Sequence, residues 1–254
     1  MARGEELVEA RRCRVCLEGE SDGQLVQPCA CRGSAKWTHK ACIERWRRTS
    51  PKEDAAYRCG ECMDHYRDAL SIELLSARLQ AERTSGQDTS FTLYTLACEL
   101  HDQGKYGEAE PLYREALELD RQTLGNRHQS TLDSINNLGA LLQDKGDLTA
   151  AEPLYREALE LDRGTLGSRH KNTLASINNL GVLLHNKGDL AAAEPLYREA
   201  LEVRRATLGD RHPHTLASIT NLGLLLYAKE DLAAAEPLLR EALEGRHATR
   251  LGTV

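Results

Sequence analysis

Apolar side chains in the C-terminal two thirds of the chain recur with a helical period. In a representative stretch, Leu132, Ile135, Leu138, Leu141 and Leu142 follow one another at three- and four-residue steps. This spacing places them on one face of an amphipathic helix. The pattern therefore predicts helices that bury one side against neighbours.

A polar break separates this helix from a second one. The break is Lys145-Gly146-Asp147, in which glycine suits a helix C-terminus and aspartate suits the next N-cap. The packing side of the second helix consists of Leu148, Ala151, Leu154, Tyr155, Ala158 and Leu161. Pro153 lies inside this helix, where a proline breaks or kinks it. Because Pro111, Pro153, Pro195 and Pro237 share one position, we expect a common local bend and not broken helices.

The helix pair repeats with a period of 42 residues. Three short strings share this period: Ala-Glu-Pro-Leu at Ala109, Ala151, Ala193 and Ala235, Asn-Leu-Gly at Asn137, Asn179 and Asn221, and Thr-Leu-Gly at Thr123, Thr165 and Thr207. Self-similarity at a period of roughly 20–50 residues is typical of stacked repeat arrays. The C-terminal body is therefore predicted to be an α-solenoid.

Composition and charge change between the two ends of the 254-residue chain. Seven of the eight cysteines lie between Cys13 and Cys62, and residues 1–68 carry a net charge of +1 against −7 for residues 69–254. The acidic total argues against a general nucleic-acid binder. No apolar run is long enough to span a membrane, and the N-terminus lacks a signal-peptide core. The expected compartment is the cytoplasm or the nucleus, where clustered cysteines serve as metal ligands more often than as disulfides.

The N-terminal ligand candidates form four pairs, Cys13 with Cys16, Cys29 with Cys31, His39 with Cys42, and Cys59 with Cys62. Such pairs chelate zinc, and eight ligands suit two tetrahedral Zn²⁺ sites. Consecutive pairing would give two unconnected knuckles. Interleaved pairing explains the arrangement better and assigns Cys13, Cys16, His39 and Cys42 to one ion and Cys29, Cys31, Cys59 and Cys62 to the other.

The repeats resemble tetratricopeptide repeats, and more closely the longer form found in kinesin light chains. The resemblance lies in Asn137-Leu138-Gly139, Ala151-Glu152-Pro153 and the Leu-Gly-x-x-His connection, and it covers about residues 89–254. The predicted units are 89–130, 131–172, 173–214 and 215–254, after a zinc module at 8–68 and a helical linker at 69–88. In this family the concave face binds peptides, which implies such a role for Asn137, Asn179 and Asn221. Inter-helix hydrogen bonding is the alternative for these asparagines.

The interleaved cysteine module resembles RING-type zinc fingers of the RING-CH subtype. PHD fingers share the ligand order, but Cys29-x-Cys31, the gap to His39, Trp46 four residues after Cys42, and the string Cys29-Ala-Cys31-Arg-Gly-Ser match RING-CH. The two resemblances imply a mainly α fold class: a small zinc-stabilised cross-brace RING-CH domain followed by an α-solenoid of four tetratricopeptide-type helix pairs.

The RING-CH resemblance implies a RING-type E3 ubiquitin ligase that acts by scaffolding, without a nucleophile of its own. Its partners would be a ubiquitin-conjugating enzyme charged with ubiquitin and a protein or peptide substrate on the repeats. The resemblance implies that Val15, Trp46 and Pro51 contact the conjugating enzyme, with Arg58 and Gly60 nearby. Trp46 as a core residue and Val15 as incidental filler are the alternatives.

A second function class is a non-catalytic adaptor built from the same two modules. Met63 favours it, because many RING ligases have an arginine just after the last ligand. Two other features are assigned structural roles. Cys98 aligns with Ala140 and Val182, which predicts packing, and His128, His170 and His212 recur between repeats, where a helix-end role is expected.

Overall fold

The computed structural model describes residues 11–19, 21, 23–32, 36–63, 66 and 69–250, without the side chains of Glu53, Ala56 and residues 248–250. The outer limits predicted for the zinc module and the last repeat, residues 8 and 254, lie outside this part, as do Gly33 and Ser34 of the RING-CH string. The chain forms two compact units, 1–112 and 113–254. The predicted domain limits at 68 and 88 stay a prediction.

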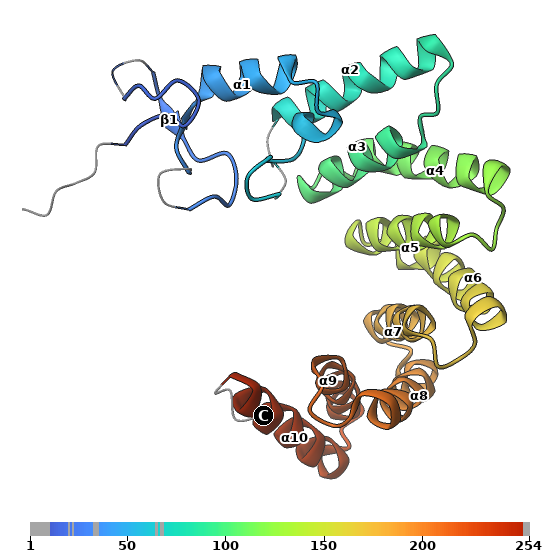
Figure 1. The fold of residues 1–254 in the computed structure, drawn as a ribbon. Coiled ribbons are helices and arrows are strands. Elements are labelled where there is room, and N and C mark those ends of the chain that lie inside the picture. The colour runs from blue at the N-terminus through green and yellow to red at the C-terminus, as the bar shows by residue number, and fades with distance from the viewer. Residues whose placement is uncertain are drawn as a thin grey trace, which may run out of the picture. The chain divides into compact units, whose positions relative to one another are not determined.

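The N-terminal module has little regular structure. Strand β1 (Leu25–Val26) pairs antiparallel with β2 (Thr38–His39), and helix α1 (Lys40–Thr49) and the 3-10 helix η3 (Glu53–Ala56) follow (Figure 1). Its apolar core is small and consists of Cys31, Ile43, Cys59 and Tyr66, with Cys29, Trp46 and Cys62 packed against it. So small a core needs cross-links or a metal to be stable.

Helix α2 (Ala69–Ser85) follows this module and packs against η3 and α3 (Ser90–Asp102). Residues 69–85 of the predicted linker are helical. A buried arginine joins α1 to α2: Arg47 donates to Ser71 Oγ at 2.7 Å and lies 4.3 Å over the Tyr66 ring. Ser71 Oγ in turn donates to the Tyr66 carbonyl at 2.6 Å.

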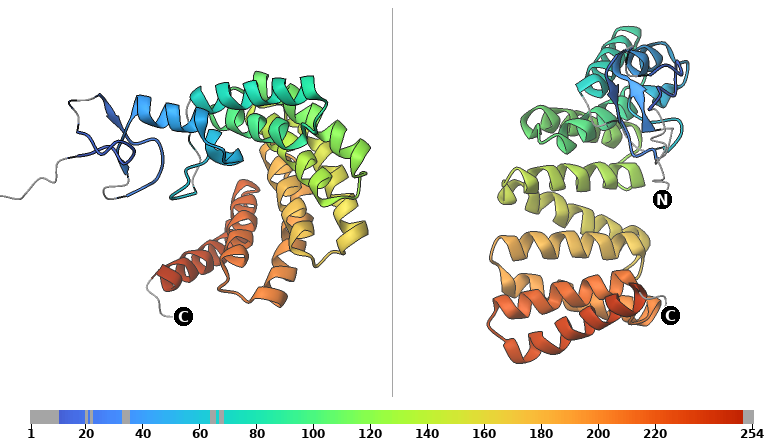
Figure 2. Two further views of the ribbon diagram at one scale, coloured as in Figure 1. Left: turned by 45° about the horizontal axis from the view of Figure 1, so that its top comes forward. Right: turned by 90° about the vertical axis from the view of Figure 1, so that its left-hand side faces the viewer.

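The repeat region contains α3 and the helices α4 (Tyr106–Thr123), α5 (Gln129–Asp144), α6 (Leu148–Leu166), α7 (Lys171–Asn186), α8 (Leu190–Leu208), α9 (Pro213–Ala228) and α10 (Leu232–Arg250). From α5 to α10 these helices are antiparallel and pack in chain order (Figures 1 and 2). Each helix from α6 to α9 packs on the one before and the one after it. Helices α4, α6, α8 and α10 run unbroken through their prolines.

The helix boundaries follow the predicted turn chemistry. Gly146 has φ +89°, and the Asp147 side chain accepts the Ala150 N–H at 3.0 Å as an N-cap. The recurring histidines are also N-caps. In His128, His170 and His212 the Nδ1 atom accepts a backbone N–H two residues later, at 3.2 Å in each case. Their predicted helix-end role is confirmed.

Two recurring contacts hold the helices of the repeat region together, one within each helix pair and one between successive pairs. The helices of one pair meet closely where Gly139 faces Tyr155 and Gly181 faces Tyr197. Successive units are joined by ion pairs between residues 36 apart, Arg121–Glu157, Arg163–Glu199 and Arg205–Glu241. Within the described residues, no helix is long and apolar enough to cross a membrane.

Candidate metal centre

The first cluster of ligand atoms brings together three cysteines and one histidine. Cys13 and Cys16 come from the turn before β1, His39 from the end of β2 and Cys42 from the first turn of α1. The four ligand atoms lie within 4.8 Å of one another. Interleaved pairs of the sequence, and not consecutive ones, therefore converge here.

His39 is oriented toward this cluster by a backbone carbonyl. Its Nε2 lies 2.8 Å from the Gly19 carbonyl oxygen, and its Nδ1 lies 3.3 Å from Cys16 Sγ and 3.9 Å from Cys42 Sγ. Donation from Nε2 leaves Nδ1 free to act as a ligand, as in metal sites whose histidines are held by an outer partner. Sequence reasoning missed Gly19 because its backbone oxygen carries no residue-type signal.

The second cluster consists of cysteines alone, Cys29, Cys31, Cys59 and Cys62, again within 4.8 Å of one another. Cys31 and Cys59 are 5% and 0% exposed, and their sulfurs are 3.7 Å apart. Zn–S bonds of about 2.3 Å in a tetrahedron place sulfurs about 3.8 Å apart. The donor type and the spacing both fit zinc.

The turns at Cys13–Cys16 and Cys59–Cys62 share one backbone design. Leu17 N–H donates to the Cys13 carbonyl at 2.8 Å, and Met63 N–H donates to the Cys59 carbonyl at 2.9 Å. Leu17 and Met63 both have a positive φ, 69° and 59°, a conformation that L-residues seldom adopt. Each turn thus holds its two thiols on the same side, as chelation by a cysteine pair requires.

Backbone amides favour the thiolate form at the start of each turn. Burial opposes ionisation of Cys13, but N–H groups that include those of His39 and Val15 outweigh it and lower its pKa to about 6. Burial also opposes ionisation of Cys59, where backbone N–H groups and Arg14 lower the pKa to about 6. Thiolate is the form that ligates metal.

Two of the residues assigned to partner binding meet at a cavity beside the clusters. A cavity of about 260 Å³ is lined by Arg14, Val15, Ile43, Trp46, Lys52, Gly60 and Glu61. Val15 is 46% exposed, whereas Trp46 is half-buried and also packs on the module's core. Gly60 approaches the Trp46 ring, since a Cβ there would lie 3.9 Å from it. Pro51 is exposed and does not line this cavity.

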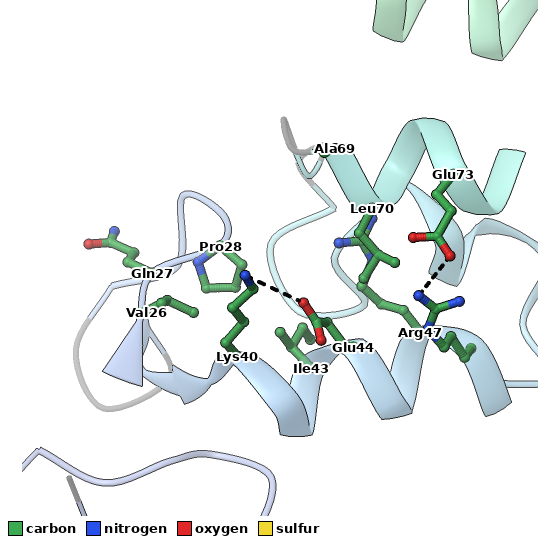
Figure 3. Close-up of a pocket in the computed structure, with 11 residues that line it drawn as sticks. Val26, Gln27, Pro28, Lys40, Ile43, Glu44, Arg47, Ala69, Leu70 and Glu73 are labelled. Carbon is green, nitrogen blue, oxygen red and sulfur yellow. Dashed lines mark ion pairs between the residues drawn. The ribbon is translucent and has the colours of Figure 1, made fainter. Parts of the chain in front are cut away.

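A second cavity of about 450 Å³ lies between α1 and the start of α2 (Figure 3). Two ion pairs lie among its lining residues, Lys40 with Glu44 at 4.0 Å and Arg48 with Glu73 at 2.8 Å. Leu70 and Pro28 supply apolar walls. The residues assigned from the sequence to metal or partner binding do not line it.

Two of the three repeat asparagines, Asn137 and Asn221, donate hydrogen bonds within the protein. Asn221 Nδ2 donates to Asn178 Oδ1 of the preceding unit at 2.8 Å, and Asn137 Nδ2 donates to the Asp133 carbonyl at 2.7 Å. Asn137, Asn179 and Asn221 are each half-buried on α5, α7 and α9. The bond to Asn178 supports the inter-helix role for Asn221, and a peptide role for the three stays a prediction.

Cys98 is half-buried on α3.

The repeat region places the chain in a known class. The tetratricopeptide repeat family matches residues 88–164, 130–206 and 172–247, which is more than half of the chain. The chain therefore belongs to the tetratricopeptide repeat family. The RING-variant domain family matches residues 13–62, the segment that runs from the first to the last predicted ligand.

The curated relatives resemble the N-terminal domain. The E3 ubiquitin-protein ligase MARCHF5 of Xenopus laevis is 38% identical over 61 residues, which is 22% of this chain and 22% of that protein. The E3 ubiquitin-protein ligase MARCHF9 of Homo sapiens is 36% identical over 55 residues, 22% of this chain and 15% of that protein. The match spans about a fifth of the length of these relatives or less. The N-terminal domain is thus a RING-CH domain of the kind found in E3 ubiquitin ligases.

Solved structures resemble the helical array. A kinesin light chain of Podosopora anserina with nearly identical TPR-like repeats superposes with a TM-score of 0.65 at 21% identity, covering 82% of this chain and 92% of that one. BtubC (BKLC) of P. vanneervenii gives 0.59 at 22% identity, covering 73% and 85%. These likenesses establish the solenoid fold.

Proposed function

We propose that this protein is a RING-type E3 ubiquitin ligase. The RING-CH domain binds a ubiquitin-conjugating enzyme charged with ubiquitin, and the repeats recruit a protein substrate. The observation that carries the proposal is the cavity beside the ligand clusters, where exposed Val15 and half-buried Trp46 present apolar surface. Both side chains are fixed by elements that the clusters tie together.

Two Zn²⁺ ions are part of this proposal. Cys13, Cys16, His39 and Cys42 would hold one, and Cys29, Cys31, Cys59 and Cys62 the other. Zinc in such sites is structural and supplies folding free energy. The turn carrying Val15, the helix carrying Trp46 and the loop carrying Gly60 each contain or adjoin ligands from the clusters, so metal binding fixes the walls of the cavity.

The chain's own residues would act by positioning. With every cysteine of the module in a cluster, the domain offers no free thiol to accept ubiquitin, so ubiquitin would pass directly from the conjugating enzyme to a substrate amine. Holding two reactants in one geometry lowers the entropic part of the barrier. The repeats add a second anchoring point for the substrate, and Asn137, Asn179 and Asn221 are its proposed polar contacts.

The test is autoubiquitination by the full chain with a panel of conjugating enzymes. We expect Val15→Glu to reduce the rate by roughly 100-fold or more, because a charge buried in an apolar contact costs several kcal/mol. Leu17→Glu is the matched control. Leu17 is 69% exposed on the same turn and lies outside the cavity, so this variant should retain the wild-type rate.

The outcomes distinguish a wrongly assigned binding surface from a wrongly assigned function. Equal activity of Val15→Glu and wild type would mean that the cavity does not bind the conjugating enzyme. A folded wild-type protein with two bound zinc ions that is inactive with the whole panel would favour the adaptor function instead. Met63, 53% exposed after the last ligand, is the feature that favours this second function, since it cannot make the charged contacts of an arginine.

A further inference from the structure

The backbone of Arg14 lies in the turn that carries Cys13 and Cys16 of the first ligand cluster, and its side chain contacts the second cluster. It lies between Cys13 and Cys16, inside the turn closed by the Leu17 N–H. Its own N–H donates to the Trp37 carbonyl at 3.0 Å, which anchors this turn to the residue just before β2, the strand that ends in His39. The first cluster therefore determines where the Arg14 side chain starts.

The guanidinium of Arg14 reaches the second cluster. Its Nη1 donates to Cys31 Sγ at 3.3 Å and its Nη2 donates to Cys59 Sγ at 3.4 Å. Both cysteines are buried and Arg14 is half-buried, so these bonds are partly shielded from bulk water. The planar fork of an arginine can bridge two acceptors at once, which a lysine ammonium on its flexible stem does less well.

The second cluster has a charge that a cation would balance. Four thiolates and one Zn²⁺ sum to a charge of about −2, against about −1 for three thiolates, a neutral histidine and Zn²⁺. Charge-assisted hydrogen bonds from a guanidinium stabilise such sulfurs. Loss of an outer-shell partner typically lowers metal affinity by about 10–100-fold.

The geometry points to Arg14 as a positioning residue that couples the two metal sites. Metal in the first cluster fixes the turn that aims the guanidinium, and the guanidinium raises the zinc affinity of the second cluster. Linkage makes the coupling reciprocal, so a filled second cluster also favours the first. This inference rests on the proposed binding of two zinc ions.

The experiment measures metal affinity at each site in the full chain. Replacing zinc by ¹¹³Cd²⁺ gives separate NMR signals for a site with four sulfurs and a site with three sulfurs and one nitrogen, and a chelator titration then yields both affinities. We expect Arg14→Met to weaken the four-sulfur site by about 10–100-fold. The other site should change less, and Arg14→Lys should fall between Met and wild type.

Arg12→Met is the matched control, since Arg12 is exposed two residues earlier and should leave both affinities unchanged. Coupling is tested with Cys16→Ser, which opens the first cluster. This change should weaken the four-sulfur site in the wild-type background and add little in the Arg14→Met background.

Two results would overturn the coupling: an unchanged four-sulfur site in Arg14→Met, or the same effect of Cys16→Ser in both backgrounds. Limited proteolysis of each zinc-loaded variant checks that the segment between Cys13 and Cys62 stays folded. Failure of the wild type to bind metal at all would refute the proposed zinc sites, an outcome distinct from these two.

Discussion

At the scale of single residues, Gly139 on α5 and Gly181 on α7 have a defined steric role. A Cβ at Gly181 would lie 2.8 Å from Tyr197 Cε1, and one at Gly139 would lie 2.9 Å from Tyr155 Cε1. Both tyrosine rings are buried, at 2% and 3% exposure. The glycines therefore allow the two helices of a unit to approach until an aromatic ring fills the gap.

We predict that Gly181→Ala destabilises the array. Overpacking of a buried contact costs about 1–3 kcal/mol in the free energy of unfolding, which should lower the urea midpoint followed by far-UV circular dichroism. Gly164→Ala in α6 is the matched control, because nothing lies within 4 Å of its Cβ position. That change should stabilise the helix by up to about 1 kcal/mol. Equal effects of the two substitutions would refute the close-packing argument.

The ligand residues could be found from the sequence because cysteine and histidine pairs are rare and their spacing is informative. The contacts around them could not. The Gly19 carbonyl that orients His39 lacks a side-chain signal, and Arg14 reaches Cys31 and Cys59, which are 17 and 45 residues away. Such contacts depend on how the chain returns to one place, which local spacing does not determine.

At the scale of helices and repeats, sequence periodicity predicted most of what is observed. Start and end signals such as Asp147 and Gly146 act within a few residues, so they mark the helices correctly. One buried position whose residue type differs between the repeats was not predicted from the sequence. Asp120 and Asp162 accept the hydroxyls of Ser134 and Ser176 at 2.6 Å, but Arg204 occupies the next equivalent position.

The structure shows how an arginine replaces an aspartate there. Arg204 Nη1 donates to Ser218 Oγ at 2.6 Å, and Nη2 donates to the Leu174 carbonyl at 3.3 Å. The serine changes from donor to acceptor, which a hydroxyl can do by rotating its hydrogen. A reversed charge is thereby accommodated at one position, 8% exposed, without changing the helix pair.

Two ion pairs between successive repeats, Lys187–Glu152 and Lys229–Glu194, form a lysine and glutamate ladder that predicts a pH dependence of stability. A hydrogen bond from Lys187, and then one from Arg156, lowers the pKa of Glu152, and Lys229 and Arg198 do the same for Glu194. A carboxyl whose pKa is lowered on folding stabilises the protein above its unfolded pKa of about 4.3. This contribution is lost as the pH falls through the lower, folded pKa.

Glu152→Gln combined with Glu194→Gln should therefore flatten the acid side of the stability curve. We expect the wild type to lose more free energy of unfolding than the variant between about pH 5 and pH 3, by about 1 kcal/mol for two partly exposed networks. Urea midpoints across this range provide the measurement. Glu160→Gln with Glu202→Gln, two exposed carboxylates at matched positions, should keep the wild-type curve. An identical curve for the ladder variant would contradict the prediction.

At the scale of the whole molecule, the two kinds of architecture depend on different forces. Among its described residues, the RING-CH domain has a small core cluster of Cys31, Ile43, Cys59 and Tyr66 and two ligand clusters, whereas the repeats bury periodic leucines and alanines along α5 to α10. Repeat arrays are stabilised by contacts between neighbouring units. Stability of the array should therefore not require metal.

Metal removal should separate the two parts. A chelator is expected to abolish ubiquitin transfer, because small zinc domains unfold without their ion, while far-UV circular dichroism retains most of its helical signal. Limited proteolysis should then cleave between Cys13 and Cys62 and spare α5 to α10, and added zinc should restore the resistance. Cys98→Ser is the control, since Cys98 lies outside both clusters and its loss should leave zinc content and proteolysis unchanged. Collapse of the helical signal on chelation would show that the array depends on the RING-CH domain for its fold.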